Sequence, residues 1–529
     1  GQVVPDGRRW HGSPARPTDV DYRSVGDLPC GTVRRVAYSV AQLFTLLFVY
    51  LPLGFGGLAV LVARVPQLAV LVAPGPMALT SATFYRDAVI AATALLLGTL
   101  VIGLLSVMTL PRLLNLGLRP DRVYRLYGVH YSLYRTIARL TNVKLFTRIF
   151  GDSSAVVHYL RCLGWDLGRI EQSGSNFGTE VRQEIPYLSA VGSGTMVADG
   201  LSMLNSSFSS TAFRVSRVSI GPHNFLGNRI VYPAQGRTGA NCLLATKVLV
   251  PIDGKVREGV GLLGSPSFEI PRSVERDGRF DELKGPGELR TRLRRKNAHN
   301  LATVALFLLT RWCYVFGLVL LAGVTLDLYD RLGPLAFALD VAATPLLTVA
   351  YFVLLERAIT AVHALRPLYC SIYERDFWRR ERYWKVPAEV YMKLFDGTPF
   401  KPALLRMLGV PIGRRVFDDG CYLTERSLCS IGDEATLNAG SVVQCHSQED
   451  GTFKSDRSAL GARVTLGVGA FVHYGVTIGP GAVLSADSFL MKGEAVPSGA
   501  HWGGNPAVEI HDRRHDRRAA LAAVGGGRA

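Results

Sequence analysis

A period of six residues near the C-terminus constrains the fold of this chain more than any other feature. Aliphatic residues occupy every sixth position over this stretch, and glycine follows several of them. The aliphatic positions are Leu460, Leu466, Val472, Ile478, Leu484, Leu490 and Val496. An antiparallel strand alternates with a period of two, whereas a period of six with glycine corners is typical of a parallel β-helix with three faces per coil. We therefore predict a β-helix in which each aliphatic side chain stacks on the one eighteen residues away.

This pattern resembles the left-handed hexapeptide-repeat β-helix of acyltransferases. A degraded copy of it lies earlier in the chain, where "VSIGPHNFLGNRIVYPAQG" from Val218 matches "VTLGVGAFVHYGVTIGPGA" from Val464. This alignment places Gly227 opposite His473. We call the earlier copy the middle unit, with its β-helix at 164–272, and the later copy the last unit, with its β-helix at 410–510.

Four apolar runs are long enough to cross a bilayer, which takes roughly 20 residues of helix. They cover residues 36–63, 88–110, 301–326 and 335–355. Arginine and lysine cluster outside each pair of runs, and the short connections within the pairs hold few positive charges. The positive-inside rule then predicts two transmembrane hairpins in the cell membrane, with both β-helices in the cytoplasm. The net charge of +17 follows from these basic flanks and does not indicate a nucleic-acid partner.

A Gly-x-Pro element recurs at Gly12, Gly264 and Gly504, so the chain is built from a repeated unit of hairpin, connector and β-helix. Basic, aromatic segments follow each hairpin, and we expect them to lie in the headgroup layer. The predicted segments are 1–16, the tail of an upstream β-helix unit; 35–112, a transmembrane hairpin; 120–163, amphipathic interfacial helices; 164–272, the degenerate β-helix; 273–298, a basic linker; 299–357, a second hairpin; 358–409, further interfacial helices; 410–510, the β-helix that carries activity; and 511–529, a basic Gly/Ala-rich tail.

The period breaks once in the last unit, at "CHSQEDGTFKSD" from Cys445 to Asp456. Such a break predicts a loop that projects from a corner and walls the groove beside a neighbouring β-helix. A neutral imidazole suits general base catalysis near pH 7, so His446 is our candidate catalytic base. We predict that Asp450 or Glu449 orients its ring. Lys454 and Asp456 are predicted to bind substrate charge or to hold the loop.

His473 and Tyr474 lie at a corner where glycine is usual, and we expect them to contact substrate in the same groove. The middle unit reads "NSSFSSTAFRVS" from Asn205 in place of the loop, so a serine replaces the histidine. The middle unit is therefore predicted to be a scaffold or a groove partner. Three such units in tandem would form a pseudo-trimer within one polypeptide, and the chain could also form a homo-oligomer. No metal site is predicted.

The phrases "HSQEDGTFKSD", "GAFVHYGVTIGPGAVLSADSFLMKGE" and "WGGNPA", with alternating hairpins and β-helices, resemble the C-terminal half of Pls-type nonribosomal peptide synthetases, the ε-poly-lysine synthetase-like family. The resemblance implies that adenylation and carrier domains, upstream or on another protein, supply an aminoacyl thioester on phosphopantetheine. The tandem domains would then join it to a small-molecule amine acceptor, giving short poly(amino acid) products. His446 is the position that the resemblance implies as the base.

Two other functions remain open from the sequence. The chain could be a membrane acyltransferase that uses acyl-CoA to modify an alcohol or an amine. It could instead be a non-catalytic scaffold or export module, and Arg311 and Asp340 within the apolar runs favour a polar path.

Overall fold

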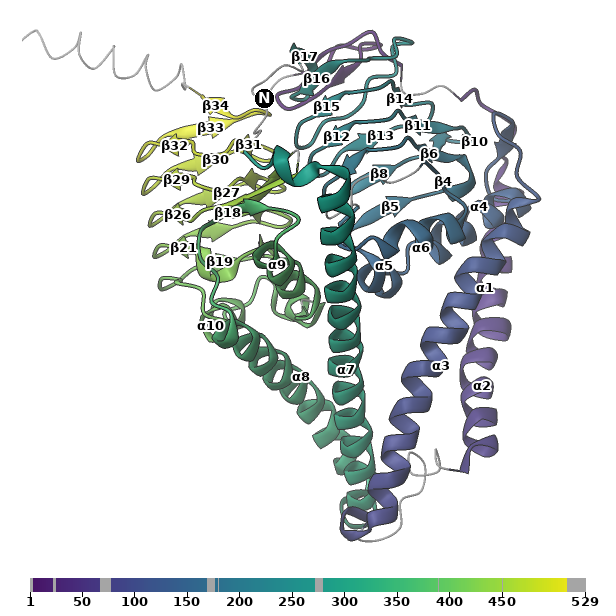
Figure 1. The fold of residues 1–529 in the computed structure, drawn as a ribbon. Helices are drawn as coiled ribbons and strands as arrows, with labels where there is room; N and C mark the ends of the chain where they lie inside the picture. The colour runs from purple at the N-terminus through teal and green to yellow at the C-terminus, as the bar shows by residue number, and fades with distance from the viewer. Residues whose placement is uncertain are drawn as a thin grey trace, which may run out of the picture.

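The computed structural model divides into a bundle of long helices and two β-helices that stand side by side above it (Figure 1). The structure describes residues 3–21, 25–66, 78–168, 177–178, 180–271, 279–388, 390–449 and 451–510. The predicted tail at 511–529 and residues 273–278 of the predicted linker lie outside the described residues. All eight cysteines are free thiols.

Four helical spans in the described residues are long and apolar enough to cross a membrane. They match the four predicted runs but are longer, and the third also extends toward the β-helices. The first span is continuous over α1 (Thr32–Thr45), the π-turn η1 (Leu46–Tyr50) and α2 (Leu51–Arg64); the others are α3 (Ala82–Asn115), α7 (Pro286–Leu332) and α8 (Leu335–Val362). The short helix η3 (Ala78–Thr80) precedes α3, and η5 (Asp281–Lys284) precedes α7.

The last unit forms the predicted parallel β-helix of three sheets. Pairing joins positions eighteen apart, as in Leu460 with Ile478 and Val472 with Leu490, and these side chains are buried. The first sheet holds β19 (Phe417–Asp418), β22 (Thr436–Leu437), β27 (Thr465–Leu466), β30 (Val483–Leu484), β33 (His501–Gly503) and β34 (Val508–Glu509). The second holds β20 (Tyr422–Leu423), β23 (Val442–Val443), β28 (Phe471–Val472) and β31 (Phe489–Leu490). The third holds β21 (Cys429–Ile431), β26 (Ser458–Leu460), β29 (Thr477–Ile478) and β32 (Ala495–Val496).

The middle unit repeats this architecture, and its aliphatic core is continuous with Leu96 and Phe307 of the long helices. One sheet holds β4 (Asp166–Leu167), β6 (Ser189–Val191), β11 (Val218–Ile220) and β14 (Arg237–Thr238). A second holds β5 (Val181–Gln183), β8 (Leu201–Met203) and β13 (Val231–Tyr232). The third holds β7 (Met196–Val197), β12 (Phe225–Leu226), β15 (Leu243–Leu244), β16 (Val260–Leu263) and β17 (Phe268–Pro271). The left-handed sense of both coils stays a prediction.

Each unit carries a hairpin inserted at the same place in its second coil. Val443 pairs with Val472, and Met203 with Tyr232, so 29 positions separate partners that elsewhere lie 18 apart. The inserted strands are β24 (His446–Glu449) and β25 (Thr452–Ser455), and β9 (Ser206–Phe208) and β10 (Ala212–Val215). The two units therefore correspond with an offset of 240.

This offset corrects the alignment that we made from the six-residue period. That alignment was displaced by one repeat, because a period of six matches itself at every repeat. His473 corresponds to Pro233 and not to Gly227.

The connector segments pack on protein through the faces that we expected to contact lipid. Helix α9 (Arg375–Lys385) buries Phe377 and Trp378 against Phe453 of the inserted hairpin, and β18 (Leu368–Ser371) pairs with β25. The equivalent α4 (Val129–Leu140) and β3 (Val123–Arg125) pack on the β9–β10 hairpin. The projecting hairpins therefore cover the aromatic rings of these helices, and the headgroup-layer position of the connectors stays a prediction. The remaining connectors are α5 (Lys144–Phe150), α6 (Ala155–Leu163), η4 (Pro186–Leu188), η6 (Val390–Phe395), α10 (Phe400–Met407) and η7 (Arg426–Leu428).

Three Gly-x-Pro turns meet at the end of the β-helices farthest from the long helices. Ser13 N donates to Ser265 O (2.8 Å), Ser265 N to Asn505 O (3.1 Å), and Asn505 N to Ser13 O (2.9 Å). The glycine before each has a φ of +91° to +103°, the left-handed region that favours glycine. The ring is cyclic, so the N-terminal segment, with its hairpin of β1 (Trp10–His11) and β2 (Arg16–Pro17), takes the third place beside the two units.

The two β-helices also contact each other along their length. Asn228 Nδ2 donates to Gln444 Oε1 (2.9 Å), and the Arg229 guanidinium lies 5.7 Å from the centre of the Phe471 ring. Lys247 forms an ion pair with Asp487 and donates to the Gly469 carbonyl. A boundary between two β-helices therefore exists, as the groove hypothesis requires.

Candidate functional site

His446 begins the inserted hairpin of the last unit, immediately after the buried Cys445. Its Nδ1 lies 2.7 Å from Glu425 Oε1; the imidazole is 16% exposed, and the Glu425 side chain is fully buried. A carboxylate accepts, so Nδ1 carries the proton and the Nε2 lone pair is left available. Within the part of the chain that the structure describes, Nε2 has no hydrogen-bond partner.

Glu425 is held by two donors besides His446. Trp384 Nε1 donates to Oε1 at 2.7 Å, and the Thr424 hydroxyl donates to Oε2. Burial by itself raises the pKa of this carboxyl, but the His446 imidazole, the Thr424 hydroxyl and the charge of Arg380 outweigh it, so the pKa is lowered. Glu425 is therefore an anion that fixes the tautomer and direction of the His446 ring.

Two aromatic rings fix the plane of the imidazole. The Trp384 ring stacks on it with 4.5 Å between centroids and 28° between planes, and Phe453 of the facing strand lies 5.6 Å away. Trp384 belongs to α9, so the connector helix both covers His446 and hydrogen-bonds its carboxylate partner. A ring held in this way loses little conformational freedom when it accepts a proton.

A buried carboxyl of the middle unit, that of Asp152, lies near His446. Asp152, in the loop between α5 and α6, is 6% exposed and lies close enough to His446 for their charges to interact. Lys385, next to Trp384, donates from Nζ to the Ile149 carbonyl (3.2 Å), which joins the last turn of α5, just before this loop, to α9. Burial raises the pKa of Asp152, against the opposing charges of nearby cations, chiefly Lys385.

A buried ion pair anchors α9 to the long helix α7. Lys296 Nζ lies 2.8 Å from Glu381 Oε1, with side-chain exposures of 0% and 3%. Burial raises the pKa of Glu381 to about 7, against the stabilising charge of Lys296. The candidate base is therefore supported by elements of both units and of the helical bundle.

The structure places His473 and Tyr474 near the same corner. His473 is buried, with Nδ1 accepting from Tyr474 N at 3.0 Å, and its ring lies 5.2 Å from that of Tyr474. Burial is the main cause that lowers the pKa of His473 to about 3; the charge that His446 bears when it is protonated and the charge of Lys492 act in the same direction. His473 is therefore neutral, with its proton on Nε2, and Tyr474 is partly exposed.

The four acidic and basic loop candidates differ in position. Asp450 and the side chain of Glu449 lie outside the described residues. Their predicted orienting role stays a prediction, and among the described side chains Glu425 is the carboxylate that contacts the His446 ring. Lys454 lies over the Tyr369 ring at 5.2 Å, on the strand face opposite Phe453. Asp456 is exposed and its Oδ1 accepts from Arg457 N at 2.7 Å, while its own amide donates to Cys445 O at 3.1 Å and closes the base of the hairpin.

The middle unit has a different polar group at the equivalent corner. Ser206 takes the place of His446, and both its amide (2.9 Å) and its hydroxyl donate to Glu184. The Tyr134 hydroxyl lies 3.0 Å from the Ser206 hydroxyl. Ile185 occupies the position of Glu425, so the carboxylate–imidazole pair is absent from this corner of the described chain.

Glu425, Trp384 and Asp152 were missed from the sequence. One pattern pointed to Glu425: extending the period of six backward from Ile431 reaches residue 425, where an aliphatic residue is expected and a glutamate stands. No comparable pattern pointed to Trp384 or Asp152, because their place depends on how the connectors fold over the hairpins.

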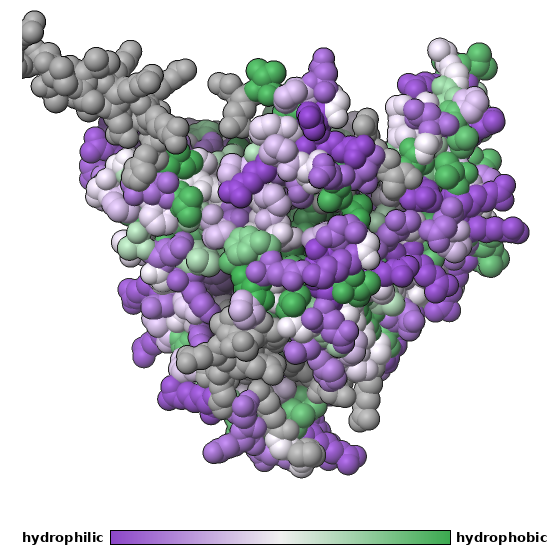
Figure 2. Space-filling model, turned by 90° about the horizontal axis from the view of Figure 1, so that it is seen from above, coloured by the Kyte–Doolittle hydropathy of each residue, from purple (hydrophilic) through white to green (hydrophobic). Residues whose placement is uncertain are grey.

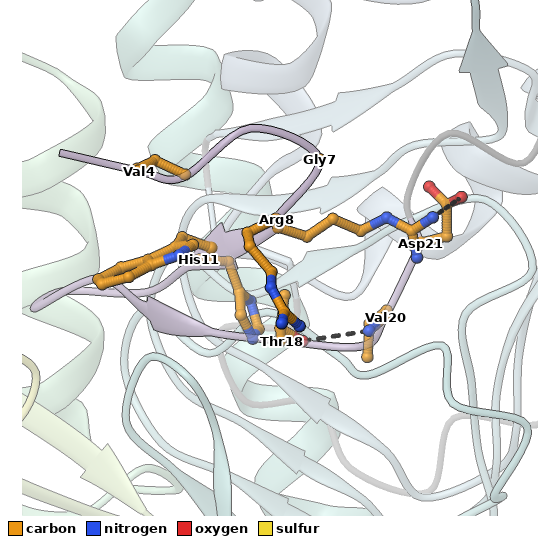
Figure 3. Close-up of a pocket in the computed structure, with 9 residues that line it drawn as sticks. Val4, Gly7, Arg8, His11, Thr18, Val20 and Asp21 are labelled. Carbon is orange, nitrogen blue, oxygen red and sulfur yellow. Dashed lines mark hydrogen bonds and ion pairs between the residues drawn. The ribbon is translucent and has the colours of Figure 1, made fainter.

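A hollow in the N-terminal segment is remote from this chemistry. It has a volume of about 530 Å³ and is lined by the N-terminal segment alone, including Val4, His11 and Thr18 (Figure 3). The ion pair of Arg9 with Asp21, at 2.8 Å, closes one side. None of its lining residues belongs to either β-helix, so we assign it no role in catalysis.

Most of the chain is similar in sequence to one known protein. The chain is 26% identical over 423 residues to Delta-poly-L-ornithine synthetase of Acinetobacter baumannii, covering 76% of this chain and 30% of that protein. The chain resembles a poly(amino acid) synthetase. It spans less than a third of the length of this relative. No protein-family model matches the chain.

Other similarities concern parts of the chain. The putative colanic acid biosynthesis acetyltransferase WcaF of Escherichia coli is 28% identical over 160 residues, which are 25% of this chain and 85% of WcaF. Among solved structures, a hexapeptide-repeat acetyltransferase of Vibrio cholerae is 19% identical with a TM-score of 0.20, covering 23% of this chain and 86% of its own. A galactoside acetyltransferase in complex with coenzyme A is 18% identical with a TM-score of 0.19, covering 22% and 72%.

Proposed function

We propose that the last unit catalyses amide-forming acyl transfer, with His446 as the general base and Glu425 as its positioning residue. The observation that carries this proposal is the 2.7 Å contact between His446 Nδ1 and the buried Glu425 carboxylate, at the boundary between two β-helices. The contact leaves Nε2 as the acceptor, which is the arrangement that a base for a nucleophile requires.

The step has a simple balance. A neutral amine attacks the carbonyl carbon of an acyl thioester, and His446 Nε2 takes the proton that the nitrogen loses. The C–N bond forms, the C–S bond breaks, and the imidazolium returns its proton to the leaving thiolate. Glu425 stabilises the imidazolium in the interval, while backbone amides near the hairpin supply hydrogen bonds to the oxyanion.

The donor we propose is an aminoacyl thioester on the phosphopantetheine of a carrier domain. The similarity to a poly(amino acid) synthetase supports this donor, and an ornithine-like cationic acceptor is consistent with it. The product would be a short poly(amino acid). Adenylation and carrier domains would act as partners, because the chain spans 30% of that relative.

We further propose that the four long helices span the cell membrane with the β-helices in the cytoplasm. Their length and apolar composition support this location, and the basic flanks support the orientation. The ring of Gly-x-Pro turns supports a pseudo-trimeric arrangement, in which Asp152 of one unit lies within electrostatic range of the base of the next.

A test uses the full chain in nanodiscs with N-acetylcysteamine thioesters of ornithine, lysine and alanine, each with a free amine acceptor. We expect an amide product by mass spectrometry with the wild type and none with His446→Ala. Product formation by His446→Ala at the wild-type rate would overturn the assignment of the base. Acetyl-CoA serves as a second donor in the same assay.

The second candidate is an acyl-CoA-dependent transferase, favoured by the similarity to WcaF. Transfer from acetyl-CoA, with no transfer from any aminoacyl thioester, would select it. An export role has less support. The Arg311 guanidinium, on which that role partly rests, donates to the carbonyls of Val386 and Pro387 at the end of α9 (3.0 and 3.2 Å), which gives it a structural function.

A further inference from the structure

The short helix α10 presents apolar side chains outward from the protein. Phe400 is 68% exposed and Met407 is 52% exposed, and Ala403 between them is also exposed. Leu404 and Leu405 fill the opposite face and are buried. A helix that packs on a soluble domain normally reserves its outer face for polar residues, so α10 is apolar on both sides. We call the surface of Phe400, Ala403 and Met407 the α10 outer face.

The middle unit supplies an internal comparison at the same place. Helix α6 ends at Gly164 as α10 ends near Gly409, and both glycines have positive φ. The matched sequences "AVVHYLRCLG" and "FKPALLRMLG" put Ala155, His158 and Cys162 where α10 has Phe400, Ala403 and Met407. Ala155 and His158 are exposed, as are their counterparts. The large apolar outer residues are therefore a property of the last unit and not of the repeat.

The α10 outer face continues the lipid-facing side of the adjacent long helix. Helix α10 lies at the end of the last β-helix nearest the bundle, beside the C-terminal end of α8 (Figure 1). On α8, Leu354 is 68% exposed and Val362 is 73% exposed. Each of these two helices also carries an exposed arginine, Arg357 on α8 and Arg406 on α10. Apolar side chains with flanking arginines suit the boundary between headgroups and acyl chains.

Another β-helix unit does not account for this surface. In the middle unit the neighbouring unit contacts the last turn of α5, where Lys385 reaches the Ile149 carbonyl, yet Ala155 and His158 of α6 stay exposed. A unit placed equivalently beside the last unit would leave the α10 outer face uncovered. The opposite end of the molecule is mostly hydrophilic, so apolar exposure is not general (Figure 2).

We propose that the α10 outer face lies in the headgroup layer of the membrane that α8 spans, and that it sets the height of the last β-helix above that membrane. The middle unit, with His158 in place of Ala403, makes no such contact. The proposal rests on α8 crossing the membrane and is independent of the acyl-transfer reaction.

Photo-crosslinking tests it directly. The photoreactive amino acid p-benzoylphenylalanine replaces Phe400 or Met407, and in matched controls Ala155 or Cys162, in the full chain in nanodiscs of phosphatidylcholine and phosphatidylglycerol. We expect lipid adducts by mass spectrometry at positions 400 and 407, at least fivefold above those at 155 and 162. Equal adduct yields at all four positions would overturn the proposal. Adducts to a second copy of the chain instead of lipid would also overturn it, because they would identify a protein interface.

Hydrogen exchange gives a second readout that does not depend on the label. Phe400→Glu, at an exposed position, should leave the β-helix protected but increase exchange in 400–407 when the protein is in nanodiscs. Ala155→Glu should change nothing in α6. Equal exchange in α10 between wild type and Phe400→Glu in nanodiscs would contradict the membrane contact.

Discussion

The middle and last units share one architecture but differ at the corner where the hairpin is inserted. In the last unit His446 pairs with the buried carboxylate of Glu425 and lies under Trp384. In the middle unit Ser206, Glu184 and Tyr134 satisfy one another by hydrogen bonds. The comparison teaches that the hairpin and its connector helix are structural parts of the repeat, while the imidazole–carboxylate pair is an addition to one copy. Each prediction below changes one side of this comparison.

The largest effect is expected from His446→Ala. Without the base, the rate of amide formation should fall by about 10²- to 10⁴-fold, because the amine must lose its proton to water. The matched control is Ser206→Ala, which should leave the rate unchanged. Thioester-dependent product formation in nanodiscs measures both. A comparable loss in Ser206→Ala would show that the middle unit is also catalytic.

Glu425→Gln should lower kcat on the order of 100-fold without a large change in KM, since the amide cannot stabilise an imidazolium or hold the same tautomer. The variant keeps the volume of the side chain, so circular dichroism should match the wild type. The middle-unit control is Ile185→Val. An unchanged kcat in Glu425→Gln would remove Glu425 from the mechanism.

A residue of the middle unit should affect the chemistry of the last. Asp152→Asn replaces a buried carboxyl near His446 whose pKa burial raises. We expect kcat to fall by roughly 3- to 10-fold at a pH above that pKa, where the carboxylate stabilises the imidazolium, and to stay unchanged below it. Asp166→Asn, an exposed carboxylate in the same unit, is the control. If both variants keep the wild-type kcat, the middle unit does not contribute to the site.

His473 makes the folding stability of the last unit depend on pH in the acidic range. Proline has no titratable side chain, so Pro233 has no such effect on the middle unit. The folded pKa of His473, about 3, lies below the unfolded value of about 6.5. The unfolded chain then binds the extra proton, so stability falls as pH drops below about 6.5 and continues to fall toward 3. Between pH 7.5 and 5.5 the loss should be about 1 kcal/mol, and His473→Asn should lose less. Thermal unfolding in detergent at both pH values measures this, and identical losses would contradict it.

The smallest effect is expected at the contact between the units. Asp487, whose side chain is 61% exposed, pairs with Lys247. Asp487→Asn should change the unfolding free energy by less than about 1 kcal/mol, because water screens the exposed partner. A larger loss in denaturant titration would mean that this ion pair holds the β-helices together.

The sequence predicted the β-helices and the four apolar spans because both follow from periodicity and length. It identified His446 because the hairpin interrupts the repeat. It could not identify Trp384, since α9 reaches His446 only after folding back onto the hairpin through Phe453. The one-repeat displacement between His473 and Gly227 has a similar origin, because only strand pairing across the insertion fixes the register.

The ring of Gly-x-Pro turns uses amide and carbonyl groups of Ser13, Ser265 and Asn505, and no side-chain atom takes part in it. Mutation can therefore alter the side chains of these three residues without removing the hydrogen bonds, although the glycine before each must be kept for its left-handed backbone. Duplicated domains fastened by main-chain atoms are free to diverge in sequence while their relative placement persists. The last unit could thus keep or gain a histidine at position 446 while the middle unit has a serine at the equivalent position 206. The arrangement of the units would not change.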